Sequence, residues 1–294
     1  MAATGSVLFS PMRIGGLELK NRVVMPPMGT NLGDRDGLAT QRTIDYYRAR
    51  AEGGAGLIVV EGACLDTVSA KASPRQLVID DDRFLPGLRK LVGAIHSGGA
   101  RVAVQLMHAG VAAGARLTPH PLSPSPFTLP DGRTSREMNP DDMALVAEQH
   151  AAAALRAKEV GFDGVEIHGA HRYLLASFLS PTMNRRQDGY GGEVPGRARL
   201  VLEVLRRVKE AVGPDYPVWL RMNGQEWMPN GLSNEDAVLI AGLAEEAGAA
   251  AVHISAWGVG DQRQQASLPT VPGGLLPLTT AIKKALRIPV IAVG

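Results

Sequence analysis

Polar side chains able to do chemistry gather where short apolar stretches of this chain end. His168 and His171 stand three residues apart, and Tyr173 follows them directly after one such stretch. Gln105 and Arg221 each lie within an apolar stretch, where burial costs free energy unless the polar group meets a partner. If these stretches are parallel strands, their carboxyl ends share one edge. The sequence therefore predicts one common polar ligand at that edge.

The two closely spaced histidines can aim both rings at one point, and their residue types leave several uses open. A zinc site needs further ligands, and no Cys, His or carboxylate stands at a matching spacing. Buried structural histidines are the other alternative for His168 and His171, and structural roles are expected for His108 and His253. An ordinary phenol has a pKa near ~10, so Tyr173 stays protonated at neutral pH and can act as an acid.

The elements that must position these residues alternate between short Val-, Ile- and Leu-rich runs and longer amphipathic stretches. Several of the longer stretches close on Gly or Pro, as helices often do. Strands are predicted at residues 22–25, 57–60, 102–106, 164–167, 218–221, 251–254 and 290–293. Helices are predicted at residues 40–53, 83–97, 141–160, 197–212, 234–247 and 275–286.

Seven strands and six helices, repeating at roughly 40 residues, predict an α/β fold that is a parallel barrel or a doubly wound sheet. No GxGxxG follows the first strand, which disfavours a nicotinamide-binding Rossmann domain. Residues 9–21 contain Gly15-Gly16 between two apolar pieces and predict a hairpin that caps the barrel bottom. The Pro-rich segment 119–130 predicts a long loop on the face where barrel enzymes keep their sites.

Composition excludes several classes of protein. The 31 Lys and Arg balance 29 Asp and Glu and are dispersed, so no nucleic-acid or anionic-membrane partner is expected. The single cysteine, Cys64, excludes a disulfide framework and a cysteine-ligated cluster within this chain. Residues 1–10 lack the pattern of a signal peptide, and no apolar run reaches ~18 residues. We therefore expect a cytoplasmic protein, with its oligomeric state left open to a homo-oligomer.

The strand-end residues are also the ones that make the sequence recognisable. The segment 168–175 reads His-Gly-Ala-His-Arg-Tyr-Leu-Leu, and Phe178-Leu-Ser-Pro181 and the segment 184–192 follow it. Over essentially its whole length the chain resembles the Old Yellow Enzyme family of NAD(P)H:flavin oxidoreductases, and most of all its branch of 2,4-dienoyl-CoA and 2-enoate reductases. The resemblance implies a (β/α)8 TIM barrel as a single domain over residues 1–294, FMN as cofactor, and NADH or NADPH as hydride donor.

The resemblance also implies which residues would hold FMN. Gln105 would bond the pyrimidine side of the ring, and Arg221 would face the locus that becomes negative on reduction. Gly62 would let the ring edge approach closely. The segment after the first strand would line the flavin with backbone groups, and the chain's last residue would begin the phosphate loop; these residues are Pro26, Pro27, Met28, Gly29 and Gly294.

For catalysis, the resemblance implies that His168 and His171 bind the carbonyl oxygen of an electron-poor alkene, such as an enone, enoate or enoyl thioester. Their donation would stabilise enolate-like charge as hydride arrives at the β carbon. Tyr173 would then protonate the α carbon from the opposite face. The expected function is an FMN-dependent reductase of activated C=C bonds in small molecules. Another flavin-barrel dehydrogenase is the alternative enzyme.

Three departures from the family pattern bear on these expectations. Gly29 stands where many relatives carry a Thr or Cys that adjusts the flavin potential. Arg172 replaces a Gly, and would strain the backbone and displace Tyr173 if that position required a positive φ. The chain ends at Gly294, whereas a closed eight-stranded barrel needs about 40 residues more. We therefore expect a C-terminally incomplete barrel, with a non-catalytic fragment that binds little FMN as a further alternative.

Overall fold

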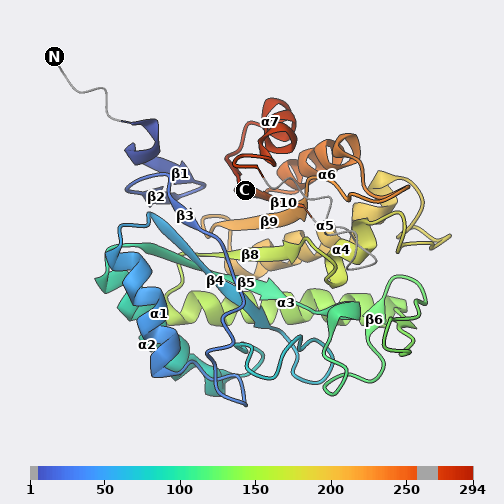
Figure 1. The fold of residues 1–294 in the computed structure, drawn as a ribbon, viewed down its shortest axis with the longest axis horizontal. Coiled ribbons are helices and arrows are strands. Elements are labelled where there is room, and N and C mark those ends of the chain that lie inside the picture. Colours follow the sequence, from blue (N-terminus) through green and yellow to red (C-terminus); the bar gives the residue numbers. More distant parts are fainter. Residues whose placement is uncertain (1–5, 257–270, 294) are drawn as a thin grey trace.

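The architecture is a seven-stranded parallel sheet that curves into a nearly closed barrel with helices outside it (Figure 1). The computed structural model describes residues 6–256 and 271–293. Along the sheet the strand order is β11-β10-β9-β8-β5-β4-β3, with every neighbouring pair parallel. The strands are β3 (Val24–Met25), β4 (Leu57–Cys64), β5 (Arg101–Met107), β8 (Gly164–Gly169), β9 (Val218–Asn223), β10 (Val252–Ser255) and β11 (Val290–Ile291). All seven predicted strands are confirmed, and the barrel is chosen over the doubly wound sheet.

The helices pack against the outer face of the sheet, as apolar runs buried on both faces require. They are α1 (Gln41–Glu52), α2 (Leu85–Ser97), α3 (Pro140–Val160), α4 (Leu174–Leu179), α5 (Val194–Val212), α6 (Asn234–Glu246) and α7 (Leu276–Ala285). Six of them confirm predicted helices, whereas the short α4 was not predicted. None of the helices in the described residues is long and apolar enough to cross a bilayer.

Helix α3 shows how local sequence sets these boundaries. The Asn139 side chain accepts from the Asp142 N–H, and the Asp142 carboxylate accepts from the Asn139 N–H. These two bonds satisfy N–H groups that have no acceptor within the helix. Pro140 occupies the first turn, where its missing N–H costs nothing. At the other end Gly161 takes the left-handed conformation, with φ 97°, and stops the helix. The predicted boundary at Gly161 is confirmed.

The predicted hairpin is present and closes the N-terminal end of the barrel. Strands β1 (Met12–Ile14) and β2 (Leu17–Leu19) pair antiparallel and turn at Gly15-Gly16. Their buried side chains join the interior residues nearest the strands' amino ends in one apolar cluster. This lower layer comprises Ile14, Leu17, Leu19, Leu57, Val59, Ala103, Trp219, Ala251 and Ile291. The barrel bottom is therefore filled, and its open end is the one where the strands finish.

The predicted long loop at the Pro-rich segment lies between β5 and α3, but it is not wholly irregular. Its β6 (Leu122–Ser123) pairs in parallel with β7 (Arg136–Glu137). The Arg186 guanidinium donates to the backbone carbonyls of Pro124 and Met138, at 2.9 and 2.8 Å, which ties this loop to the segment after β8. The loop signature after β8 therefore contributes a scaffold.

Candidate functional site

A cavity of about 500 Å³ lies at the carboxyl ends of the strands and gathers most of the predicted site residues. Strand β5 supplies Gln105, strand β8 supplies His168, and strand β4 supplies Gly62. The loops after β3 and β8 supply the remaining predicted residues that line it, which are Pro27, Gly29, His171 and Tyr173. Residues more than 140 positions apart in the sequence thus share one pocket, because parallel strands end at the same edge.

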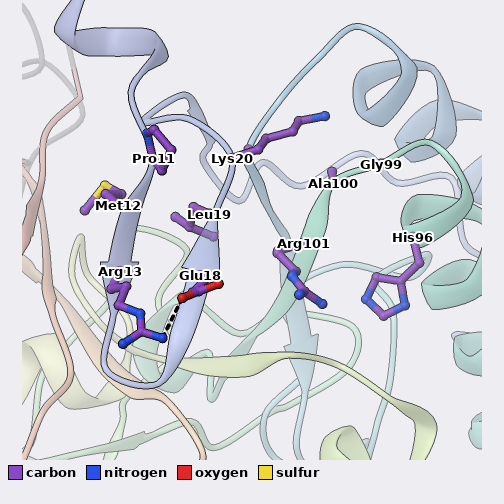
Figure 2. Close-up of a pocket in the computed structure, with 11 residues that line it drawn as sticks. Pro11, Met12, Arg13, Glu18, Leu19, Lys20, His96, Gly99, Ala100 and Arg101 are labelled. Carbon is purple, nitrogen blue, oxygen red and sulfur yellow. Dashed lines mark hydrogen bonds and ion pairs between the residues drawn. The ribbon is translucent and has the colours of Figure 1, made fainter.

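A larger cavity of about 780 Å³ lies at the opposite end of the barrel (Figure 2). The β1–β2 hairpin and the start of β5 line it, and its charged groups other than Lys20 are paired. Arg13 donates to Glu18, and both His96 and Arg101 contact Asp163, at 2.7 and 3.2 Å. Size alone would select this cavity, but it holds no convergent set of groups that remain free for a ligand. The smaller cavity is therefore the candidate site.

Three rings meet in the candidate site. The His168 and His171 ring centroids lie 5.1 Å apart at 87°, and the Tyr173 ring lies 4.7 Å from His168 and 6.1 Å from His171. Within the described ranges no group of three His, Cys, Asp or Glu side chains is placed to hold a metal ion. The arrangement is one of hydrogen-bond donors around a space that a small molecule can enter.

The two imidazoles are held neutral. Burial, reinforced by the nearby His171 and Arg221 charges, lowers the pKa of His168 well below its usual range. Burial likewise lowers the pKa of His171 to about 3. In the neutral His168 ring Nδ1 accepts from the Ala170 N–H at 3.3 Å, so the proton sits on Nε2. That Nε2–H has no hydrogen-bond partner among the described residues, which leaves it available to an oxygen in the pocket.

His171 adopts a backbone conformation that few residues other than glycine accept. Its φ is 62°, whereas Arg172 is not among the described non-glycine residues with positive φ. The strain considered at Arg172 therefore falls on His171 instead. Asn223, at the end of β9, holds this conformation from both sides: its Oδ1 accepts from the His171 N–H at 2.8 Å, and its Nδ2 donates to the His171 carbonyl at 3.1 Å. Ser255 Oγ lies 2.9 Å from His171 Nε2 and fixes the ring.

The Tyr173 phenol is protonated at neutral pH. Burial raises the pKa of its phenol above the ordinary value, although the Arg172 and Arg221 charges oppose the shift. The backbone after Tyr173 enters α4, whose six residues are all buried, so the phenol is attached to a fixed element. A group that is protonated at neutral pH and held beside two neutral imidazoles suits proton donation.

Arg221 is a buried cation whose hydrogen-bonding capacity is largely unspent. Its side chain is 6% exposed, its Nε has no partner among the described residues, and its two Nη contacts, to Pro27 O and Ser255 Oγ, are long at 3.4 and 3.5 Å. Burial lowers the pKa of Arg221, and the Glu166 carboxylate opposes that shift. A buried guanidinium with an unpaired N–H fits a ligand that brings carbonyl oxygen or negative charge to this point.

Glycine positions around the cavity also fit a flat ring. A Cβ at Gly62 would lie 2.8 Å from Met107 Sδ and 3.2 Å from Gln105 Oε1, so only glycine leaves that wall open. A Cβ at Gly29 would meet nothing within 4 Å, so the missing Thr or Cys leaves space rather than a clash. The residues present therefore fit the ring of FMN.

Some predicted residues lie elsewhere. Pro26 and Met28 are not among the lining residues, and Met28 is 49% exposed, so the side chains on either side of Pro27 turn away from the cavity. Arg221 does not line it either, but reaches it indirectly through Pro27 and Ser255. Gly294 lies outside the described residues.

Sequence reasoning missed several polar residues that build the site. Glu61 lines the cavity, and its carboxylate accepts from Thr30 N at 2.7 Å and Thr30 Oγ1 at 2.6 Å, which anchors the loop after β3. Glu166 and Asn223 are buried within β8 and β9. The available signal was a charged or amide side chain inside an apolar strand, which demands a partner.

The comparisons with known proteins agree with this geometry. The sequence profile of the NADH:flavin oxidoreductase / NADH oxidase family matches residues 7–294. The NADH oxidase of Thermoanaerobacter brockii is 43% identical over 297 residues, covering 98% of this chain and 45% of that protein. The chain thus spans about half the length of that relative.

Two solved structures share the fold. A 2-naphthoyl-CoA reductase in complex with 2-naphthoyl-CoA superposes with a TM-score of 0.88 at 30% identity, covering 97% of this chain and 46% of that one. An Old Yellow Enzyme homologue from Zymomonas mobilis superposes with a TM-score of 0.83 at 26% identity, covering 96% of this chain and 81% of that one. Together with the matched profile, these likenesses show that the chain belongs to the NADH:flavin oxidoreductase / NADH oxidase family of FMN-dependent, Old Yellow Enzyme-like oxidoreductases.

Proposed function

We propose that this protein reduces an activated C=C bond in a small molecule, using NADH or NADPH as hydride donor and FMN as the intermediate carrier. The observation that carries the proposal is the meeting of two neutral imidazoles and one protonated phenol at a pocket that has the buried Arg221 cation behind its lining residue Pro27. That set serves a reaction in which negative charge grows on an oxygen and a carbon then takes a proton.

The residues divide the work by position. His168 donates through Nε2 to the carbonyl oxygen conjugated with the alkene, and His171 stands beside it with its ring held by Ser255. Because the imidazoles are neutral, they stabilise developing charge without transferring a full proton to the oxygen. When bound, FMN supplies the hydride that reaches the β carbon. Tyr173 gives its proton to the α carbon.

Cofactor binding is assigned to the residues around the cavity. Gln105 bonds the pyrimidine side of the ring, Gly62 permits its approach, and Arg221 stabilises the reduced form by its charge. The segment Pro26, Pro27, Met28 and Gly29 contributes backbone groups to FMN binding. Gly294 would begin the loop that binds the FMN phosphate.

The substrate class is an enone, enoate or enoyl thioester, in keeping with the branch of 2,4-dienoyl-CoA and 2-enoate reductases. The 2-naphthoyl-CoA reductase supports the thioester arm, because its named ligand carries an unsaturated ring next to a thioester carbonyl. No nucleic-acid or membrane partner is proposed, and self-association into a homo-oligomer is open to measurement by light scattering.

The test separates the two halves of the reaction. The purified protein is incubated with FMN, freed of excess by gel filtration, and titrated without oxygen with NADH and with NADPH while the flavin absorbance is followed. The reduced protein is then mixed with cyclohexenone, or with cyclohexanone as the saturated control. We expect reoxidation by the enone alone, and Tyr173→Phe is expected to slow only that step, by about 100- to 10,000-fold. A protein that binds FMN but is reduced by neither nicotinamide would contradict the proposal, and reoxidation by an amine-derived product would favour another flavin dehydrogenase.

A further inference from the structure

A buried carboxylate lies at the centre of the barrel, directly beneath the pocket. Glu166 precedes His168 by two residues on β8, so both side chains point into the barrel. Its side chain is completely buried. Glu166 Oε1 accepts from Gln105 Nε2 at 2.7 Å, and Oε2 accepts from Trp219 Nε1 and His253 Nδ1, each at 2.6 Å. Four strands thus meet at one acceptor.

The carboxylate is ionised in the folded protein. Burial pushes the pKa of Glu166 upward, but the His253 and Arg221 charges and the hydrogen bonds from His253 and Trp219 outweigh burial and leave that pKa lowered. An ionised carboxylate only accepts hydrogen bonds, and an indole N–H only donates. All three partners of Glu166 must therefore present an N–H to it.

This requirement fixes the direction of the Gln105 amide. The two ends of an amide are similar in shape, so the hydrogen-bond network decides which end points where. Since the NH2 group of Gln105 must face Glu166, its Oε1 must face the other way, toward Gly62 and the pocket. None of the described residues donates to that Oε1. The pocket therefore offers a hydrogen-bond acceptor, not a donor, at Gln105.

We propose that Glu166 is a positioning residue that locks the Gln105 carbonyl oxygen toward the pocket and so selects a cofactor ring with an N–H at that point. In the oxidised flavin ring the only N–H on the pyrimidine side is at N3. The inference rests on the proposed function for the identity of the cofactor. It goes beyond that function because it assigns the selectivity to a residue that does not line the cavity.

The isosteric change Glu166→Gln should reverse the orientation of the Gln105 amide. Trp219 Nε1 donates at the Oε2 position and cannot accept, so the new side chain must place its own oxygen there. Its NH2 group then faces Gln105, and two NH2 groups in contact force the Gln105 amide to flip. The flipped amide presents its NH2 to the pocket, where a ring N–H now meets a donor.

Binding of two flavins reads this reversal directly. FMN and N3-methyl FMN, which lacks the N3–H, are titrated into the protein and followed by fluorescence quenching. We expect methylation to weaken binding at least about tenfold in the native protein, because a buried acceptor loses its partner. In Glu166→Gln we expect FMN to bind about tenfold more weakly, with N3-methyl FMN much less affected, so the preference shrinks.

Glu226→Gln is the matched control. Glu226, in the loop after β9, is also buried, and it accepts hydrogen bonds from Ser180 Oγ and Leu232 N without lining the cavity. This variant is expected to keep the native preference for FMN. A Glu166→Gln protein that folds and keeps the full native preference would overturn the proposal, and so would a native protein that binds both flavins alike.

A measurement without cofactor keeps the proposal testable if Glu166→Gln does not fold. In the ¹⁵N–¹H spectrum of the native protein, one side-chain NH2 proton of Gln105 should be shifted strongly downfield by the carboxylate, with the signal assigned by its loss in Gln105→Leu. An unshifted pair of Gln105 protons would overturn the proposal whatever the cofactor does. Conversely, a protein that discriminates between the flavins but reduces no alkene would refute the proposed function and leave the role of Glu166 intact.

Discussion

Replacing Asn223 with alanine isolates the cost of holding His171 in the left-handed conformation. Asn223 contributes two hydrogen bonds to the His171 backbone, at 2.8 and 3.1 Å, from a side chain that is 2% exposed. At about 0.5–1.5 kcal/mol each, the pair stabilises the conformation by about 1–3 kcal/mol. A left-handed non-glycine residue costs about 1–2 kcal/mol. The two magnitudes are similar, so His171 is expected to leave this conformation once the bonds are lost.

Two assays separate stability from positioning. Urea unfolding of Asn223→Ala should show a loss of about 1–3 kcal/mol. Reoxidation of the reduced protein by cyclohexenone should slow by at least about tenfold, since removing one donor to a developing oxyanion costs up to about 1000-fold. The matched control is Asn21→Ala: Asn21 also bonds the backbone twice, to Gly54 O at 2.9 Å and Val23 N at 3.0 Å, but at the far end of the barrel.

The control variant should lose similar stability and keep the native rate of reoxidation. If the reduced Asn223→Ala and Asn21→Ala proteins are reoxidised at the same rate, the hydrogen bonds from Asn223 to the His171 backbone do not serve the reaction, and the reasoning fails.

Three further changes have expected outcomes. Gly62→Ala places a Cβ 2.8 Å from Met107 Sδ and should weaken FMN binding by about 1–3 kcal/mol, whereas Gly93→Ala, whose Cβ meets nothing within 4 Å, should leave the dissociation constant unchanged. Burial lowers the pKa of His150 to about 4, so the unfolded chain takes up this proton first and stability is lost as the pH falls below about 6.5. His150→Gln should make that fall shallower by about 1.4 kcal/mol per pH unit in urea titrations, and parallel pH curves would contradict the assignment. Burial raises the pKa of Glu226 to about 7, so its contribution to stability is present below about pH 4.3 and lost as the pH rises toward the folded value. Glu226→Gln should remove this loss, and an unchanged slope of stability between about pH 4.3 and 7 would count against it.

The sequence predicted the parts of the fold that repeat and the parts of the site that are close in sequence. Apolar runs located all seven strands, and the spacing of His168, His171 and Tyr173 was enough to expect three neighbouring rings. The short α4 escaped because its six residues are all buried, so no amphipathic pattern marks it.

Other features could not be predicted because they depend on contacts between distant strands. Glu166 and His253 are 87 residues apart, and only the pairing of β8, β9 and β10 in the curved sheet brings them together. His253 was expected to be structural, and it bonds Glu166, whose carboxylate also contacts Gln105. Likewise, the left-handed conformation of His171 depends on Asn223, 52 residues further along the chain, so local sequence placed the strain at Arg172 instead.

The interior of the barrel is divided between an apolar lower layer and a polar upper one, and this division shapes how such a protein can evolve. Trp219 belongs to both layers: its ring packs in the lower cluster, and its N–H bonds Glu166. Mutations among the loop residues at the open end can change substrate preference while the lower layer keeps the chain folded. Position 219 is different, because a substitution there is expected to alter folding and, through Glu166, cofactor preference together. Sequence change during evolution should therefore be fastest in the loops at the open end of the barrel and slowest at Trp219.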